Sequence, residues 1–391
     1  MIQRERLIKD FQKLTAIDSL SFQEREMADA LTKILRELDV EVFEDDVHRY
    51  YHSQAGNIYG YLKGNIQGSP VLFSAHMDTV EPGIGKKAIF NDEGIFVSDG
   101  KTILGSDDVA GIVAILEALR VIKEDHLSHR DIEVFFPIAE EVYIQGSRMF
   151  DYSQFKAKQA YVLDLSGPIG TASLQEPTLI SFQIEVIGQA SHAGFSPETG
   201  IHAIAIAAKA IEHIQQGRID EETTVNIGKI NGGTATNIVP EKVVIEGEIR
   251  SYQHQKALDT LNFLTDVFQQ IARASGAAIK VDHHIYLEAY QIPSNTKVVQ
   301  DFVQVCQENQ IDSKLTKTFG GSDNNSLVKH SIQGIVLACG MNCVHSTQEY
   351  MRLDDLEKST HIVLGLMCHK EEKSNVITES ERLFCTVSSC Q

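Results

Sequence analysis

The chain has 391 residues, a length that fits two domains or one large domain better than a single ordinary core. Its 35 Lys and Arg against 54 Asp and Glu give a formal net charge of −19, which argues against nucleic acid as a partner because an acidic surface repels a phosphate backbone. Hydrophobic residues make up 42% of the chain and charged residues 23%, which excludes wholesale disorder. The sequence shows neither an apolar run approaching the ~20 residues of a membrane span nor a signal-peptide core, so we expect a cytoplasmic protein without membrane contact.

The first half of the chain alternates helical and apolar segments. Two helices are expected at the start, the second beginning at a capping box formed by Ser21 and Glu24. A further helical pattern covers residues 108–121. Three apolar runs predict buried strands: 71–75, 132–139 and 160–163. Continuous apolar strands separated by helices are typical of a mostly parallel sheet that is covered on both faces.

The pattern changes after about residue 178. Strands that alternate apolar and polar residues appear, as in a sheet with one solvated face, and the order β-α-β-β-α-β is that of a ferredoxin-like unit. Each of its two helices has a candidate buried face: Ile201, Ile204, Ala208 and Ile211 in the first, and Leu261, Leu264, Phe268 and Ile271 in the second.

Past Pro293, helices alternate with apolar strands again, the clearest strand being 334–338. The predicted architecture is therefore a discontinuous α/β domain of residues 1–177 and 291–391, interrupted by a smaller α+β domain of residues 178–290. Residues 371–391 show no periodicity and are expected to form a loose tail.

Six cysteines lie at positions 306, 339, 343, 368, 385 and 390, without the dense spacing of a disulfide scaffold. They are interpreted as reduced thiols. Cys339 and Cys343 are interpreted as packing residues, because a lone C-x-x-x-C is a poor zinc signature.

Acidic and histidine residues follow the predicted strands of the α/β domain. His76 and Asp78 come directly after the strand 71–75 and share one face, so His76 is placed as a metal ligand and Asp78 as the acceptor of its other imidazole N–H. Asp107 precedes a helix that Asp108 could cap. The other candidates follow later strands: Glu140, Glu141, Asp164 and His345.

Taken singly, each of these residues has an ordinary explanation as a core histidine, a helix cap, a strand end or a turn residue. Together they place several carboxylates after buried strands with no Lys or Arg close by, where desolvation is costly. Open α/β sheets bind ligands at the carboxyl ends of their strands. The joint pattern favours a pair of divalent metal ions such as Zn²⁺, with one carboxylate bridging them.

Nine segments resemble the M20 metallopeptidases, most closely their peptidase T-like branch. In chain order they are SAHMDTV, LGSDDVAG, IAEEVYIQGS, YVLDLSG, SHAGFSPETG, GGTATNIVPE, GEIRS, FGGSDNNSL and CGMNCVHSTQEY. The resemblance extends to about His369. It implies a catalytic domain with two Zn²⁺ ions per subunit and an inserted ferredoxin-like lid domain through which a homodimer would form.

The resemblance also implies a set of metal ligands. His76 and Asp164 would bind one ion, Glu141 and His345 would bind the other, and Asp107 would bridge the two. Carboxylate-rich sites also accept Co²⁺ or Mn²⁺, so the identity of the metal stays open.

Further roles follow from the same resemblance. Glu140 would be the general base, Asp78 would orient His76, and His192 of the lid would stabilise the oxyanion from this subunit or from a dimer partner. Two of the implied substrate contacts have simpler readings, because Arg250 could be a surface charge on a strand and Asn237 could merely close a turn. The implied substrate-binding residues are Asn237, Arg250, Gly320 and Gly321.

The predicted function is a metal-dependent exopeptidase acting on short peptides, most closely a tripeptide aminopeptidase, in which Glu140 takes a proton from an activated water. An M20-type carboxypeptidase or N-acyl amino acid amidohydrolase is the alternative, since Arg250 suits either substrate and no residue is assigned to a free substrate amine. A non-catalytic peptide-binding protein is a remote alternative, because neither Glu140 nor a metal ligand is missing.

Overall fold

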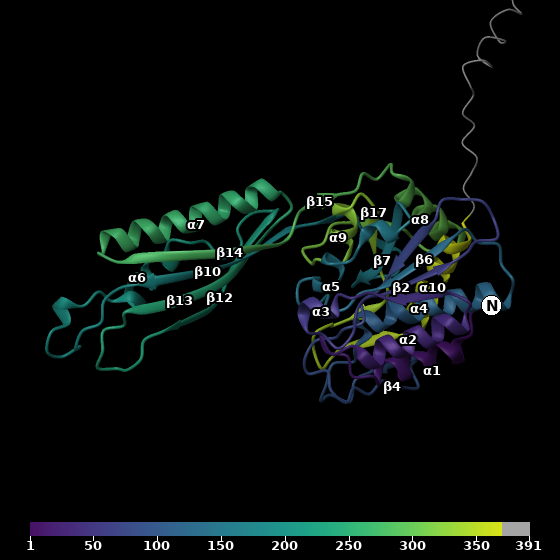
Figure 1. The fold of residues 1–391 in the computed structure, drawn as a ribbon, viewed down its shortest axis with the longest axis horizontal. Coiled ribbons are helices and arrows are strands. Elements are labelled where there is room, and N and C mark those ends of the chain that lie inside the picture. The colour runs from purple at the N-terminus through teal and green to yellow at the C-terminus, as the bar shows by residue number, and fades with distance from the viewer. Residues whose placement is uncertain (370–391) are drawn as a thin grey trace, which may run out of the picture.

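The computed structural model describes residues 1–369, which form two lobes arranged along the long axis of the molecule (Figure 1). The main lobe contains an eight-stranded mixed sheet, and the lid lobe contains a five-stranded sheet. The predicted fold class, an α/β unit interrupted by a ferredoxin-like α+β unit, is confirmed. The tail predicted for residues 371–391 lies outside the described residues.

The sheet of the main lobe has the order β1-β2-β6-β3-β7-β17-β8-β16. Its central strands run parallel and are buried over most of their length: β6 (Ile132–Phe136), β3 (Val71–Ser74), β7 (Gln159–Leu165) and β17 (Gln333–Ala338). β6 is shorter than predicted because it ends before Pro137, which has no N–H for the ladder. The outer strands are β1 (Glu41–Glu44), β2 (Ile58–Leu62), β8 (Thr171–Ser173) and β16 (Lys314–Thr316).

Helices cover both faces of this sheet. α4 (Ser106–Glu124) is buried almost throughout, because it lies between β7 on one side and α1 (Arg4–Thr15) and α10 (Leu353–Cys368) on the other. The opposite face carries an aromatic cluster that includes Phe135 and Phe155. The remaining helices of the lobe are α2 (Arg25–Glu37), α3 (His48–Tyr51), α5 (Gln145–Arg148), α8 (Lys297–Glu308) and α9 (Asn324–Lys329). A small separate sheet joins β4 (Ile89–Phe90), β5 (Ile95–Val97), β18 (Met341–Asn342) and β19 (Tyr350–Arg352).

The capping box predicted at the start of α2 is wrong. Glu24 occupies the N-cap position without a side-chain cap, and its Oε1 accepts the backbone N–H groups of Phe22 at 2.8 Å and Ala139 at 3.0 Å. Ser21 Oγ donates to Asp78 Oδ2 at 2.6 Å. Both side chains therefore bind distant partners that a local sequence pattern cannot reveal.

The sheet of the lid lobe has the order β11-β12-β13-β10-β14, and its strands pair antiparallel. These strands are β10 (Thr178–Ile187), β11 (Gly217–Arg218), β12 (Thr223–Gly232), β13 (Lys242–Ser251) and β14 (Ala278–Leu287). α7 (His254–Ala274) and α6 (Ala203–Glu212) pack on this sheet (Figure 1). The order β10-α6-β12-β13-α7-β14 is the predicted β-α-β-β-α-β arrangement.

α7 packs through most of the predicted face, but α6 does not. The buried face of α6 consists of Ala203, Ile206, Ala207 and Ala210, whereas the predicted Ile204 is 37% exposed. The helix begins after His202, whose Nδ1 accepts the N–H of Ala205, so the predicted Ile201 lies outside it. The small alanines on the buried face let α6 lie close to the sheet. Because α6 has apolar residues on both of its faces, the hydrophobic pattern of the sequence does not single out the buried one.

The chain enters and leaves the lid lobe through one short antiparallel pair, β9 (Gln175–Glu176) and β15 (Tyr290–Gln291). The side chain of Glu176 is fully buried and accepts a hydrogen bond from Ser322 Oγ. Beside this crossing, the ring of Tyr143 in the main lobe stacks on Tyr286 of β14, with 3.8 Å between centroids. These contacts join the two lobes at a narrow junction.

Cys306, Cys339, Cys343 and Cys368 are free thiols, while Cys385 and Cys390 lie outside the described residues. Cys339 is buried as expected, but Cys343 is exposed, so its interpretation as a packing residue is wrong. Within residues 1–369, none of the helices combines the length and the apolar character needed to cross a membrane.

Candidate metal centre

The candidate ligands come together at the carboxyl edge of the main sheet. His76 follows β3, Glu140 and Glu141 follow β6, and Asp164 lies near the end of β7. Asp107 stands at the start of α4, and His345 comes from the loop after β18 with a left-handed φ of 60°. Parallel strands bring their carboxyl ends to one edge, which is why His76 and His345, 269 positions apart, meet here.

Asp107 lies between two imidazoles. Its Oδ1 is 3.0 Å from His76 Nε2, and its Oδ2 is 3.2 Å from His345 Nε2. His345 Nε2 is also 2.9 Å from Glu141 Oε1. Two sets of three candidate ligands can be drawn in which the donor atoms of each set lie within 4.8 Å of one another. The sets are His76, Glu140 and Asp164, and His76, Asp107 and Glu141. Asp107 thus contacts both histidines of the cluster, and His76 belongs to both sets.

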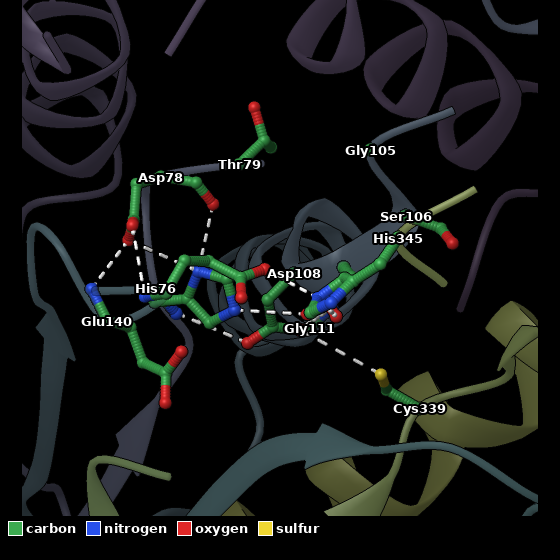
Figure 2. A network of polar contacts seen from close by, with 12 residues as sticks. His76, Asp78, Thr79, Gly105, Ser106, Asp108, Gly111, Glu140, Cys339 and His345 are labelled. Atoms are coloured by element: carbon green, nitrogen blue, oxygen red, sulfur yellow. Dashed lines mark hydrogen bonds and ion pairs between the residues drawn. The ribbon is translucent and has the colours of Figure 1, made fainter. Parts of the chain in front are cut away.

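Asp78 holds the loop that carries the two glutamates (Figure 2). Its Oδ1 accepts the N–H of Glu140 at 2.9 Å, and its Oδ2 accepts the N–H of Glu141 at 3.2 Å. His76 Nδ1 is 3.4 Å from Asp78 Oδ1 but only 2.9 Å from the backbone oxygen of Asp78. The main chain of Asp78 is therefore the nearer partner of the imidazole, and its carboxylate serves mainly the glutamate loop.

The backbone of α4 is non-helical at Asp107 and Asp108, and the Asp108 side chain caps the regular part of the helix that follows. Its Oδ1 accepts the N–H of Gly111 at 3.2 Å, and its Oδ2 accepts the N–H of His76 at the same distance. The cap of the helix is thereby tied to the strand end that presents His76 (Figure 2).

Glu349 is a supporting residue that the sequence analysis missed. Its buried carboxylate accepts the Ser106 hydroxyl at 2.5 Å and the N–H groups of Gly105 and Asp107 at 2.8 and 3.2 Å. It therefore fixes the turn that presents Asp107. The only signal was its place four residues after His345, which is not distinctive without the fold.

The site holds more negative charge than its own cations can balance. Burial and the neighbouring Asp164 raise the pKa of Glu140 well above its usual range, and burial with Asp107 does the same to the pKa of Asp164. Hydrogen bonds that His345 donates to the carboxylates of Asp107 and Glu141 raise its pKa to about 10. For Asp107 the effect of burial is outweighed by its bonds to His345 and His76, which lower its pKa.

These side chains fit a pair of divalent cations. Imidazole nitrogens with carboxylate oxygens form a donor set that Zn²⁺ accepts, and metal ions would supply the positive charge that the buried carboxylates need. Two imidazoles on the two oxygens of Asp107 suit a bridging carboxylate.

Three of the predicted substrate-binding residues meet at the junction between the lobes. Arg250 Nη1 donates to the backbone oxygen of Phe319 at 2.8 Å, directly before Gly320 and Gly321, and Arg250 Nε donates to Glu248 Oε1 at 2.9 Å. A side chain at Gly321 would place its Cβ 2.0 Å from Leu287 Cδ1, so the end of the Leu287 side chain would have to move.

His192 and Asn237 lie together elsewhere on the lid lobe. The N–H of Ala193 donates to the backbone oxygen of Asn237 at 2.9 Å, and His192 Nδ1 accepts the N–H groups of Gly194 and Phe195 at 3.1 Å each. Both side chains are exposed, and within residues 1–369 no polar contact joins them to the metal cluster. A single subunit in this arrangement therefore does not bring them to the candidate ligands.

Comparison with known proteins assigns the family. A family model for the peptidase dimerisation domain matches residues 175–275, and models for peptidase family M28 and for M42 glutamyl aminopeptidase match residues 57–215 and 257–362. The Bacillus subtilis protein YqjE, which is described as uncharacterized, is 35% identical over 94% of this chain and 99% of its own length. The crystal structure of aminopeptidase PepT from Bacillus cereus is 36% identical, with a TM-score of 0.87 over 94% of this chain and 98% of that one. The chain belongs to the M20 family of metallopeptidases, in its peptidase T-like branch.

Two further solved structures extend the comparison. A tripeptidase from Staphylococcus aureus is 33% identical, with a TM-score of 0.91 over 94% of this chain and 98% of that one. The YXEP protein of Bacillus subtilis, described as a dinuclear metal binding peptidase from the M20 family, covers 93% of this chain and 97% of its own at 18% identity and a TM-score of 0.72. The likeness to the YXEP protein shows that this chain shares its fold.

Proposed function

We propose that this M20 protein is a metal-dependent exopeptidase that acts on short peptides, as a tripeptide aminopeptidase. The observation that carries the proposal is Asp107 between His76 and His345, with Glu140 in the same cluster. The similar solved structures are described as an aminopeptidase and a tripeptidase, which favours this activity over an M20-type carboxypeptidase or an N-acyl amino acid amidohydrolase.

The site would hold two Zn²⁺ ions, with Co²⁺ or Mn²⁺ as alternatives. His76 and Asp164 would hold one ion, Glu141 and His345 the other, and Asp107 both. When bound, these ions would polarise the scissile carbonyl and lower the pKa of a water toward 7.

Glu140 is the residue proposed to move the proton. Its backbone N–H is fixed by Asp78, and its carboxylate lies with His76 and Asp164. It would accept a proton from the attacking water and pass it to the leaving amine, a task that suits a carboxyl whose pKa is raised by burial. His192 would stabilise the oxyanion after a movement of the lid or from the lid of a partner subunit.

Arg250 and the loop beside it would hold the substrate. A guanidinium binds a carboxylate through two parallel hydrogen bonds, and a peptide of two or three residues carries its terminal carboxylate close to the scissile bond. The N–H groups of Gly320 and Gly321 would donate to the peptide backbone, and Asn237 would add an amide donor from the lid.

A homodimer formed through the lid lobe and a cytoplasmic location complete the proposal. The match of residues 175–275 to a peptidase dimerisation domain supports the homodimer.

The test is product analysis by mass spectrometry. The Zn²⁺-loaded protein would be incubated with a tripeptide of three different residues, beside a chelated control. Release of the N-terminal residue that stops on chelation is the expected result. Release of the C-terminal residue would contradict the aminopeptidase assignment, and the absence of any metal-dependent cleavage would contradict the exopeptidase.

A further inference from the structure

A polar cavity lies at the junction of the two lobes, and none of the candidate metal ligands lines it. It has a volume of about 540 Å³ and is lined by residues of α3, α5, α9 and β14. In Figure 1, α3, α5 and α9 stand on the side of the main lobe that faces the lid lobe, where β14 approaches. Both lobes therefore supply the wall.

The cavity is cationic in a strongly acidic protein. Arg148, Lys329, His284 and His330 line it together with Tyr51, Tyr286 and Ser326, and the wall contains no Asp or Glu. Within residues 1–369, neither Arg148 nor Lys329 forms an ion pair. For a chain with a net charge of −19, two unpaired cations around one cavity require a separate explanation.

The hydrogen-bonding capacity of Arg148 is largely unused. Its Nη1 and Nη2 both point at one acceptor, His284 Nε2, at 3.4 Å each, and such long contacts are weak. A guanidinium has five N–H donors, so most of them are available to a ligand.

Two histidines, His284 and His330, also line this cavity. Burial and the charge of Arg148 lower the pKa of His284, although Asp282 nearby opposes this. His330 stacks on Tyr152 at 3.8 Å between centroids and donates from Nδ1 to the backbone oxygen of Ser326, and these two contacts orient its ring in the cavity wall.

We propose that this cavity binds a small tetrahedral oxyanion of the inorganic phosphate type, at a site separate from the metal centre. Arg148 and Lys329 supply the charge, and the hydroxyls of Tyr51 and Ser326 supply further donors. Donors that come from several elements surround an oxyanion better than they match a planar carboxylate, for which one guanidinium suffices.

A bound anion would also join the lobes. His284 and Tyr286 belong to the lid lobe, whereas Arg148 and Lys329 belong to the main lobe, so an anion between them favours the arrangement of lobes described above. Arg148 is in α5, which follows the loop of Glu140 and Glu141, so the site lies close to the element that presents the proposed base.

The test is calorimetric titration of the metal-loaded protein with inorganic phosphate. Three proteins would be compared: the wild type, Arg148→Gln with Lys329→Gln, and a control with Lys63→Gln and Lys158→Gln. The control loses the same charge at exposed positions, one of them just before the amino end of β7. Because phosphate can also reach the metal ions, we expect the wild type and the control to bind one more phosphate per chain than the double variant, or to bind it at least tenfold more tightly.

Equal stoichiometry and affinity in all three proteins would overturn the proposal, as would acetate competing as well as phosphate for the extra site. A selenate soak of wild-type crystals gives an independent readout, with an anomalous peak expected beside Arg148. The measurement involves no substrate, so its result is independent of the peptidase assignment.

Discussion

Ser21 Oγ donates a hydrogen bond of 2.6 Å to Asp78 Oδ2, across 57 positions of sequence. The same carboxylate accepts the backbone N–H groups of Glu140 and Glu141. A hydroxyl in the loop before α2 is therefore linked through one buried side chain to two residues of the metal cluster.

We expect Ser21→Ala to weaken metal binding and turnover together. Loss of the hydroxyl leaves Asp78 with fewer donors and a looser hold on the glutamate loop, and outer partners of metal ligands are typically worth about 10- to 100-fold in metal affinity or activity. Titration with a competing chelator and steady-state kinetics measure the two effects. Ser19→Ala is the matched control, since Ser19 Oγ is buried in the same loop and has no hydrogen-bond partner among residues 1–369. An equal loss in both variants would point to general loosening of the loop.

Glu140→Gln should retain two metal ions per chain and lose most activity. The amide keeps the size of the side chain but cannot carry a proton between water and the leaving amine, and general acid–base catalysis is worth roughly 10²–10⁴-fold. Metal content by mass spectrometry and turnover of a tripeptide are the two measurements. Glu141→Gln should instead lose an ion, because Glu141 is grouped with the candidate ligands His76 and Asp107 and also contacts His345. Near-normal turnover of metal-loaded Glu140→Gln would disprove the assignment of the base.

Arg250→Ala should remove a preference for substrates with a free C-terminal carboxylate. The wild type is expected to cleave a tripeptide about 10- to 100-fold more efficiently than the corresponding tripeptide amide, mainly through KM, because the guanidinium is assigned to that carboxylate. Arg218→Ala is the control: the guanidinium of Arg218 lies 4.3 Å from the centroid of Phe319, beside the same loop, without this role. A carboxylate preference that survives in Arg250→Ala but not in Arg218→Ala would reverse the assignment.

Glu176→Gln should flatten the dependence of stability on pH. Burial raises the pKa of Glu176 from 4.5 to about 8, so between these values the folded protein holds a proton that the unfolded chain has released. The stabilisation is complete below pH 4.5 and is lost as the pH rises through 8. Each unit of difference in pKa corresponds to about 1.4 kcal/mol, so the wild type should lose several kcal/mol of unfolding free energy over this range and the variant much less. Urea unfolding at pH 5 to 8 measures the difference; parallel curves for the two proteins would contradict it.

Periodicity and strand-end chemistry were enough to predict the two sheets and the gathering of His76, Asp107, Glu140, Glu141, Asp164 and His345 at one edge. They failed where partners are distant in sequence. Ser21 and Glu24 looked like a local cap but bind Asp78 and Ala139, and the role of Glu349 depends on a turn 242 positions away. The face of α6 was missed because alanines, rather than large apolar residues, contact the sheet. The roles of His192 and Asn237 stay predictions, since neither contacts the cluster within one subunit.

The position of β17 inside the main sheet determines when that sheet can be completed during synthesis on the ribosome. β17 pairs with β7 and β8, so the sheet cannot close until residues 333–338 have been made, after the whole lid lobe. The lid lobe has its own core and can fold while the main lobe still lacks a central strand and His345. Nascent chains that end before β17 would therefore carry a folded lid on an open sheet edge, the form most exposed to aggregation and to chaperones.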